Sequence, residues 1–181
     1  DVDRLCFVCE DGSMFGEEYT LVAVADYVLG AQPGNTVSNM SSTRALKDIT
    51  LKHGGQYYPS AVGEVNVVNR MKEVNAVIGG EGNGGIILPA LHYGRDALVG
   101  IALFLTQLAK AQKSIKQLRR TYPDYFISKN KLELEQGVNV KEVFEKIKVK
   151  YKSHPVNTED GLKIEFDNDW VHLRTSNTEP I

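Results

Sequence analysis

Residues 75–88 read NAVIGGEGNGGIIL, and this stretch decides the fold. The segment at its start, 75–78, which is apolar after Asn75, predicts a strand, and the apolar residues 86–88 predict a second short strand. Between them, residues 80–85 form a glycine-rich segment that predicts a loop. A long helix that is apolar on most faces is predicted to follow at about 95–112, which is typical of an element packed inside a domain.

Upstream of this stretch, strands and helices alternate along the chain. Apolar patterns and turn residues predict strands at 4–9, 35–38 and 56–62, and helices around 21–30, from a cap at Ser41 or Ser42 to Gly54, and across 65–71. Strands separated by helices predict an α/β domain with a mixed, largely parallel sheet and flanking helices. Functional loops of such a sheet lie outside the carboxyl ends of its strands, a position that residues 80–85 fit.

The sequence becomes charged and polar at residues 113–124, which predicts a short helix and then a domain boundary. The remainder predicts a smaller α+β domain with a strand at 131–135 and an amphipathic helix at 140–149. A hairpin should follow, in which Leu162, Ile164 and Phe166 share one face. We therefore expect domains at 11–118 and 122–181, preceded by a first segment at 1–10 that contains the first strand.

Composition indicates an ordinary globular protein, with 42% hydrophobic residues, 24% charged residues and a formal net charge of −2. These values argue against disorder and against a basic surface for nucleic acid. The longest apolar run, 97–105, is too short to span a bilayer, and no segment resembles a signal peptide, so no membrane partner is expected. The cytoplasm is the expected compartment.

Cys6 and Cys9 have C-x-x-C spacing but fall in the predicted strand at 4–9. Alternation would place them on opposite faces of that strand. A zinc site would also need a second pair of ligands, and the four histidines are scattered without ligand spacing. We interpret both cysteines as small core residues.

The end of the chain, residues 174–180, has the chemistry of a phosphate clamp. Arg174 offers a rigid fork of donors that matches a pair of phosphate oxygens. Ser176, Asn177 and Thr178 can add side-chain donors, and successive backbone N–H groups can form an anion-binding concavity. The alternative is a turn at Asn177 beside a surface cation at Arg174.

Three segments in this order resemble the C-terminal half of an alpha-D-phosphohexomutase, the family of phosphoglucomutase, phosphomannomutase and phosphoglucosamine mutase. Residues 1–4, Asp-Val-Asp-Arg, resemble the end of its Asp-x-Asp-x-Asp-Arg metal loop, whose first Asp would precede this chain. Residues 80–84 resemble its sugar-recognition loop, and residues 174–180 its phosphate loop. The likeness covers nearly all 181 residues. It implies that residues 1–10 hold the end of the metal-loop domain, residues 11–118 the sugar-binding domain and residues 122–181 an incomplete phosphate-binding domain.

The resemblance implies a reaction in which a phosphorylated serine exchanges its phosphoryl group with a hexose phosphate through a hexose 1,6-bisphosphate, which also serves as activator. That serine would lie in the N-terminal half of the same protein, so this fragment alone is expected to be inactive. Asp1 and Asp3 would be two of three Mg²⁺ ligands, and Arg4 would lie beside the reacting phosphate. The alternative for these residues is a solvated terminus.

For the substrate, the resemblance assigns Glu81 and Asn83 to hydroxyls of the sugar, and Arg174, Ser176, Asn177 and Thr178 to the phosphate that is not reacting. Hydroxyls at the middle of the ring keep their place when the sugar turns end for end, so the same loop can hold both orientations. As a bare motif, the glycine-rich segment also matches a dinucleotide-binding turn or a simple tight turn. Glu64 follows a strand and either faces the cleft or only starts a helix.

Tyr93, Arg95 and Asp96, near the start of the next helix, are similar cases. We interpret Asp96 as a helix cap rather than as a ligand.

Two departures leave proton transfer and substrate preference open, because many relatives carry His at the position of Gly85 and Lys at that of Ser41. Glucose, mannose and glucosamine phosphates all remain candidates. The alternatives are therefore a phosphoglucosamine mutase of cell-wall precursor synthesis, or a sugar-phosphate-binding module without catalysis. In every case we expect Glu81 and Arg174 to meet one phosphorylated hexose in a single cleft.

Overall fold

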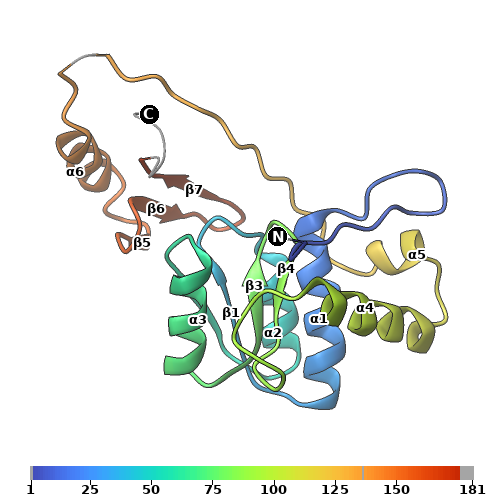
Figure 1. The fold of residues 1–181 in the computed structure, drawn as a ribbon. Helices are drawn as coiled ribbons and strands as arrows, with labels where there is room; N and C mark the ends of the chain where they lie inside the picture. The colour runs from blue at the N-terminus through green and yellow to red at the C-terminus, as the bar shows by residue number, and fades with distance from the viewer. Residues whose placement is uncertain (1, 136, 176–181) are drawn as a thin grey trace. The chain divides into compact units, whose positions relative to one another are not determined.

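A computed structural model describes residues 2–135 and 137–175 (Figure 1). Asp1, Ser176, Asn177 and Thr178, which carry part of the predicted metal and phosphate sites, lie outside the described residues. The chain divides into two compact units, Asp1–Phe126 and Ile127–Ile181, and each is described here by itself.

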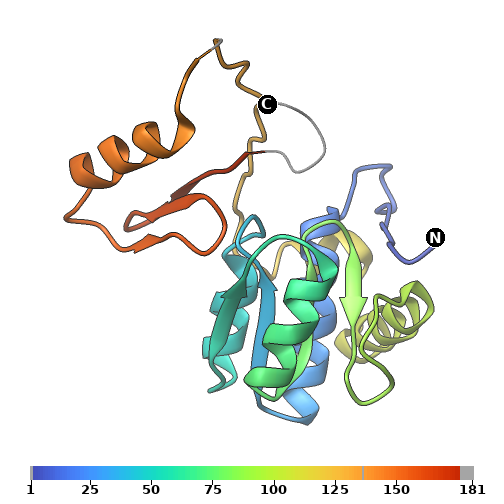
Figure 2. The same cartoon turned by 60° about the vertical axis from the view of Figure 1, so that its left-hand side comes forward.

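The first unit is built on a four-stranded sheet with the order β2-β1-β3-β4 (Figures 1 and 2). Its strands are β1 (Asn35–Asn39), β2 (Tyr57–Ser60), β3 (Ala76–Glu81) and β4 (Gly85–Ile87). β1 pairs in parallel with β2 and β3, whereas β4 runs antiparallel to β3. The predicted mixed, largely parallel sheet is confirmed.

Helices cover both faces of this sheet (Figure 2). The helices of this unit are α1 (Glu17–Ala31), α2 (Ala45–Lys52), α3 (Glu64–Glu73), α4 (Ala97–Ala111) and α5 (Ile115–Arg119), and α5 lies next to α4. Because side chains alternate along a strand, Ile86 joins the apolar cluster of α1, α2 and α4, while its neighbour Ile87 joins the cluster of α3. The two clusters hold the sheet between two layers of helices. They therefore also hold in place the edge of the sheet where the parallel strands β1, β2 and β3 have their carboxyl ends.

Of two predicted helix caps, one is confirmed and the other is wrong. Asp96 caps α4 as predicted, since its carboxylate accepts a hydrogen bond of 3.0 Å from the backbone N–H of Val99. The cap predicted at Ser41 or Ser42 is wrong, because α2 begins at Ala45 and its cap position makes no side-chain hydrogen bond. The Ser42 hydroxyl is instead engaged by the loops at the end of the sheet, as described below.

The strand predicted at 4–9 is also wrong. Only isolated bridges form there, between Arg4 and Gly85 and between Val8 and Met14. The segment turns back on itself, with Cys9 N–H bonded to the Ser13 carbonyl at 2.7 Å, and so does not extend the sheet. Cys9 is buried as expected, but Cys6 is exposed, which corrects its assignment to the core.

The second unit contains one helix, α6 (Val140–Lys150), and a three-stranded antiparallel sheet within the described residues. The strands are β5 (Val156–Asn157), β6 (Leu162–Glu165) and β7 (Trp170–Leu173), in that order. The predicted hairpin and amphipathic helix are confirmed. The strand predicted at 131–135 does not form, because no other strand pairs with its backbone in the described part of the chain.

Among the helices of the described residues, none combines the length and the apolar character needed to cross a bilayer.

Candidate functional site

The glycine-rich loop lies at the carboxyl end of β3, where Glu81 is the last residue of the strand. The chain then turns directly into the antiparallel strand β4 rather than into a helix, so the dinucleotide-binding interpretation does not hold. Gly84 has φ 85°, and a Cβ atom there would lie 2.1 Å from the Leu5 carbonyl oxygen. Glycine is therefore required for the turn and for the close approach of the N-terminal segment.

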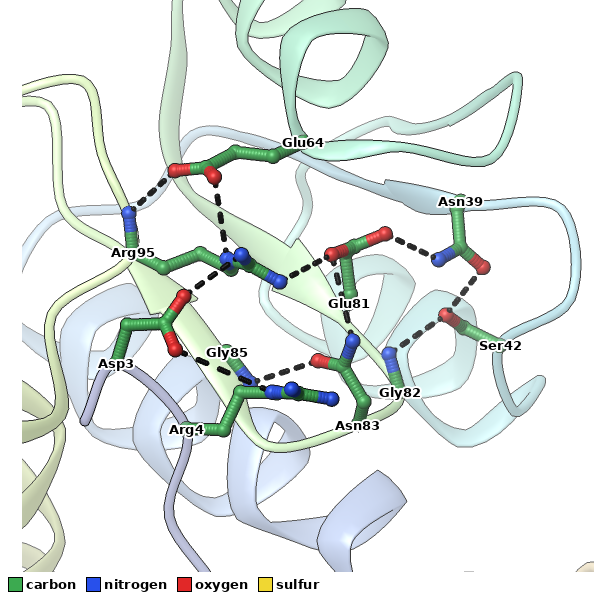
Figure 3. A network of polar contacts seen from close by, with 10 residues as sticks. All are labelled: Asp3, Arg4, Asn39, Ser42, Glu64, Glu81, Gly82, Asn83, Gly85 and Arg95. Carbon is green, nitrogen blue, oxygen red and sulfur yellow. Dashed lines mark hydrogen bonds and ion pairs between the residues drawn. The ribbon is translucent and has the colours of Figure 1, made fainter. Parts of the chain in front are cut away.

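Glu81 is the buried acid at the centre of the site, with 4% of its surface exposed. One carboxylate oxygen, Oε1, accepts a hydrogen bond of 3.0 Å from Asn39 Nδ2. The other, Oε2, lies 3.1 Å from Arg95 Nη1 and 3.4 Å from Asn83 Nδ2 (Figure 3). Asn39 ends β1, so neighbouring parallel strands bring these polar side chains together at one edge of the sheet.

Arg95 joins three carboxylates from three parts of the chain (Figure 3). Its Nη2 lies 2.7 Å from Asp3 Oδ2, its Nε lies 3.2 Å from Glu64 Oε2, and its Nη1 contacts Glu81. Its backbone N–H also donates a hydrogen bond of 2.9 Å to Glu64 Oε1. The predicted site residues Asp3, Glu64 and Glu81 are therefore brought together by a residue that the sequence analysis did not assign to the site.

The loop that follows β1 holds the glycine-rich loop in place. Ser42 Oγ donates to Asn39 Oδ1 at 3.0 Å and accepts from the Gly82 backbone N–H at 3.0 Å. Asn83 Oδ1 accepts from the Gly85 N–H at 3.1 Å. Both contacts satisfy backbone N–H groups of the loop, so the position of Glu81 and Asn83 is defined by hydrogen bonds on either side.

Arg4 and Asp3 lie on the N-terminal segment beside this loop. The Arg4 side chain is 56% exposed, and its Nε lies 4.0 Å from Asp3 Oδ1. Asp3 Oδ2 therefore contacts Arg95, whereas Asp3 Oδ1 lies beyond hydrogen-bond distance of Arg4. A carboxylate oxygen such as Oδ1 is the kind of ligand that Mg²⁺ prefers. Across residues 2–135 and 137–175, no group of three or more His, Cys, Asp or Glu side chains is arranged to hold a metal ion, and of the two predicted Mg²⁺ ligands only Asp3 lies among these residues.

Arg174 belongs to the second unit and is described with its neighbours there. Its Nε lies 3.4 Å from Asp160 Oδ2, at the base of the β6–β7 hairpin. His172 Nε2 lies 2.6 Å from the Asp160 carbonyl oxygen, and burial lowers the pKa of this histidine. A cavity of about 580 Å³ adjoins this end of β7 and is lined mainly by apolar side chains of α6 and of residues 130–134, together with Arg174 and Thr175.

Sequence reasoning missed Asn39 and did not assign Arg95 to the site. Asn39 carried a usable signal, since it directly follows the strand predicted at 35–38 and so lies at the functional edge of a parallel sheet. Arg95 carried a weaker one: it directly precedes the cap of α4, and a cation near a helix N-terminus is unfavourable unless other charges compensate it.

Comparison with known proteins gives one consistent result. A family model described as phosphoglucomutase/phosphomannomutase, alpha/beta/alpha domain III, matches residues 16–125. A phosphoglucomutase/phosphomannomutase of Thermococcus kodakarensis is 35% identical over 100% of this chain and 40% of its own length. A phosphoglucosamine/phosphogalactosamine mutase of Sulfurisphaera tokodaii is 30% identical over 100% of this chain and 41% of its own.

Among solved structures, a phosphoglucomutase/phosphomannomutase family protein of Burkholderia thailandensis matches with a TM-score of 0.80 and 25% identity. The match covers 98% of this chain and 38% of that protein. The chain therefore spans about two fifths of the length of the curated relatives it matches.

Proposed function

Because the chain belongs to the phosphoglucomutase/phosphomannomutase family, we propose that it forms the sugar-binding part and a phosphate-binding part of a mutase that interconverts a hexose 1-phosphate and a hexose 6-phosphate. The observation that carries the proposal is the buried Glu81 carboxylate, held at the carboxyl end of β3 by Arg95 and Asn39. A carboxylate fixed in this way can accept hydrogen bonds from hydroxyls of a sugar ring.

Glu81 and Asn83 would bind the sugar together. A carboxylate offers about four acceptor sites, and Asn39, Arg95 and Asn83 use three of those on Glu81. The contact with Asn83 is the longest of the three, at 3.4 Å, so the Asn83 amide is the partner that a sugar hydroxyl would displace. The freed amide could then donate to the ring as well.

The reaction would use a phosphorylated serine in the N-terminal half of the full-length protein and a hexose 1,6-bisphosphate as intermediate and activator. Arg4 would lie beside the reacting phosphate, and Arg174, with Ser176, Asn177 and Thr178, would hold the other one. Asp1 and Asp3 would hold Mg²⁺, which when bound neutralises charge that develops on the transferring phosphoryl group. That Glu81 and Arg174 contact the same hexose phosphate stays a prediction.

The test is a mutase assay of the full-length protein with glucose 1-phosphate and mannose 1-phosphate, each with Mg²⁺ and the matching bisphosphate. We expect interconversion by the full-length protein and none by the 181-residue chain. Glu81→Gln should raise KM at least about tenfold, because the carboxylate loses acceptor strength toward the sugar. The matched control Glu73→Gln changes an exposed acid on α3, paired with Arg70, and should leave KM unchanged.

Turnover by the 181-residue chain itself, or an unchanged KM in the Glu81→Gln protein, would contradict the proposal. A full-length protein that binds hexose phosphates without interconverting them would favour the alternative, a binding module without catalysis. Tagged full-length protein viewed in cells would check the cytoplasmic location, which stays a prediction.

A second candidate substrate is glucosamine phosphate, as used in cell-wall precursor synthesis. It is favoured by the Sulfurisphaera tokodaii relative, which is named as a phosphoglucosamine/phosphogalactosamine mutase. Glu81 and Asn83 would contact hydroxyls that the three sugars share, so they do not distinguish them. Including glucosamine 1-phosphate in the same assay would rank the substrates by kcat/KM.

A further inference from the structure

Arg95 is fixed in place along its whole length. Its backbone N–H is bonded to Glu64, and the next residue, Asp96, donates its N–H to the Ile86 carbonyl at 2.8 Å. The side chain then crosses the start of β4, where a Cβ atom on Gly85 would lie 2.5 Å from Arg95 Cδ. The side chain therefore lies against the glycine-rich loop itself, and only 18% of it is exposed.

The guanidinium gives a different nitrogen to each of three carboxylates: Nη2 to Asp3, Nε to Glu64 and Nη1 to Glu81. A planar fork can satisfy three acceptors in fixed directions, whereas a lysine ammonium is a point charge that cannot span them. Each of the three nitrogens lies within 3.2 Å of a carboxylate oxygen, so the three acids are the immediate partners of Arg95. Its effect would pass through the acids that it holds.

We propose that Arg95 is a positioning residue for Glu81, which it holds in the orientation that accepts hydroxyls of the sugar. This inference rests on the proposed function, in which Glu81 binds the substrate. Glu81 is 4% exposed, so without the arginine its charge would be buried with only the amides of Asn39 and Asn83 as partners. A buried carboxylate in that state turns toward other donors or takes up water, and either change misplaces the acceptor.

Glu64 helps to hold Arg95 in this position. It contacts both the Nε and the backbone N–H of Arg95, and the side chain of Glu64 is 34% exposed. It starts α3, a position where an acid is also favoured by the helix dipole. The geometry assigns Glu64 to holding Arg95 rather than to the sugar, and Asp3 holds the arginine from the N-terminal segment.

The experiment measures KM and kcat for a hexose 1-phosphate in the full-length protein. Arg95→Met should raise KM about tenfold, and Arg95→Lys should also raise it severalfold, since one ammonium cannot replace the fork. In a Glu81→Gln background, Arg95→Met should add less than about twofold, because a residue that acts through Glu81 has little left to change. Arg70→Met removes a guanidinium from the surface of α3 and should leave KM unchanged in either background.

Melting temperatures of the same variants separate positioning from folding. A purely structural role would lower the melting temperature and kcat equally in both backgrounds and leave KM unchanged, and that result would overturn the proposal. An equal rise of KM in both backgrounds would overturn it too. If Arg95→Met does not fold, Arg95→Lys gives the same comparison and keeps the charge.

The outcome also separates this inference from the proposed function. If Glu81→Gln alone leaves KM unchanged, the proposed sugar site is wrong. If Glu81→Gln raises KM while both arginine variants behave as the wild type, the sugar site stands and only the positioning role of Arg95 is wrong.

Discussion

A single residue, Gly85, leaves the space that Arg95 needs. A Cβ atom at position 85 would lie 2.5 Å from Arg95 Cδ, 3.1 Å from Cγ and 3.2 Å from Asn83 Oδ1. An exposed neighbour without contacts would move to make room for the added Cβ atom. The guanidinium of Arg95 does not move as easily, because it is held by three carboxylates. The Arg95 side chain occupies the space next to Gly85 and also contacts Glu81. A side chain added at position 85 would therefore affect the position of the Glu81 carboxylate.

We predict that Gly85→Ala lowers the free energy of unfolding by about 1–3 kcal/mol, the usual range for overpacking a well-packed site. Because the added methyl group displaces Arg95, KM for the hexose phosphate should rise as well. Denaturant unfolding and steady-state kinetics of the full-length protein give the two values. The control is Gly30→Ala near the end of α1, where a Cβ atom meets only His53 Cε1, at 3.7 Å, and the change should be neutral or slightly stabilising. Wild-type KM in Gly85→Ala would contradict the link.

At the scale of one element, α4 depends on its cap. Hydrogen bonding from the Val99 backbone N–H, and then from His92, lowers the pKa of Asp96. A carboxyl group whose pKa is lower in the folded than in the unfolded protein stabilises the fold above the unfolded value, about 3.9 for Asp, and loses this contribution as pH falls through the folded pKa. The cap should therefore matter at neutral pH and cease to matter in acid.

We predict that Asp96→Ala costs about 1 kcal/mol of stability at pH 7, a typical value for a lost N-cap. The difference from the wild type should shrink as pH falls below about 4, since the protonated acid caps the helix poorly. Urea unfolding curves between pH 7 and pH 3 measure it. Glu73→Ala, which removes one partner of an exposed pair on α3, should change stability little at either pH. A constant difference across this range would show that the cap does not act through its charge.

The elements that the sequence predicted well are those whose apolar pattern has a partner nearby in the chain. The helices at 17–31 and 97–111 pack on the sheet to which the strand at 35–39 belongs, and all three match the expected segments. The segment expected as a strand at 4–9 makes only isolated bridges, and the segment at 131–135 pairs with no strand in the described part of the chain. Alternation predicts that a segment has two faces, but it does not predict which backbone will pair with it.

The site shows the same limit. Glu81 and Asp3 were predicted from the resemblance to a known family and Glu64 from its place after a strand, but the arginine that joins them comes from a fourth segment and meets them only in the folded domain. The metal, sugar and phosphate roles assigned to these residues stay predictions.

At the scale of the whole molecule, the two units differ in how much apolar surface they bury. In the second unit, the buried residues among those described are Leu162, Lys163 and Ile164, and α6 buries none. The first unit holds both large apolar clusters. The end of the first unit is held in place by Tyr125, whose hydroxyl donates to Asp48 Oδ2 at 2.8 Å and whose N–H donates to the Tyr19 hydroxyl at 2.7 Å.

We therefore predict that a fragment ending after Phe126 folds by itself, with a melting temperature within about 5 °C of the 181-residue chain, because it keeps the core and the contacts of Tyr125. Residues 127–181 alone should give no cooperative transition, since a segment of this size with so small a core falls at or below the limit of independent stability. Calorimetry of both fragments measures this. As a control, a fragment ending at Asp124 loses both Tyr125 contacts and should melt lower than the one ending at Phe126. A fragment 1–126 without a cooperative transition would mean that the first unit depends on the second for its stability.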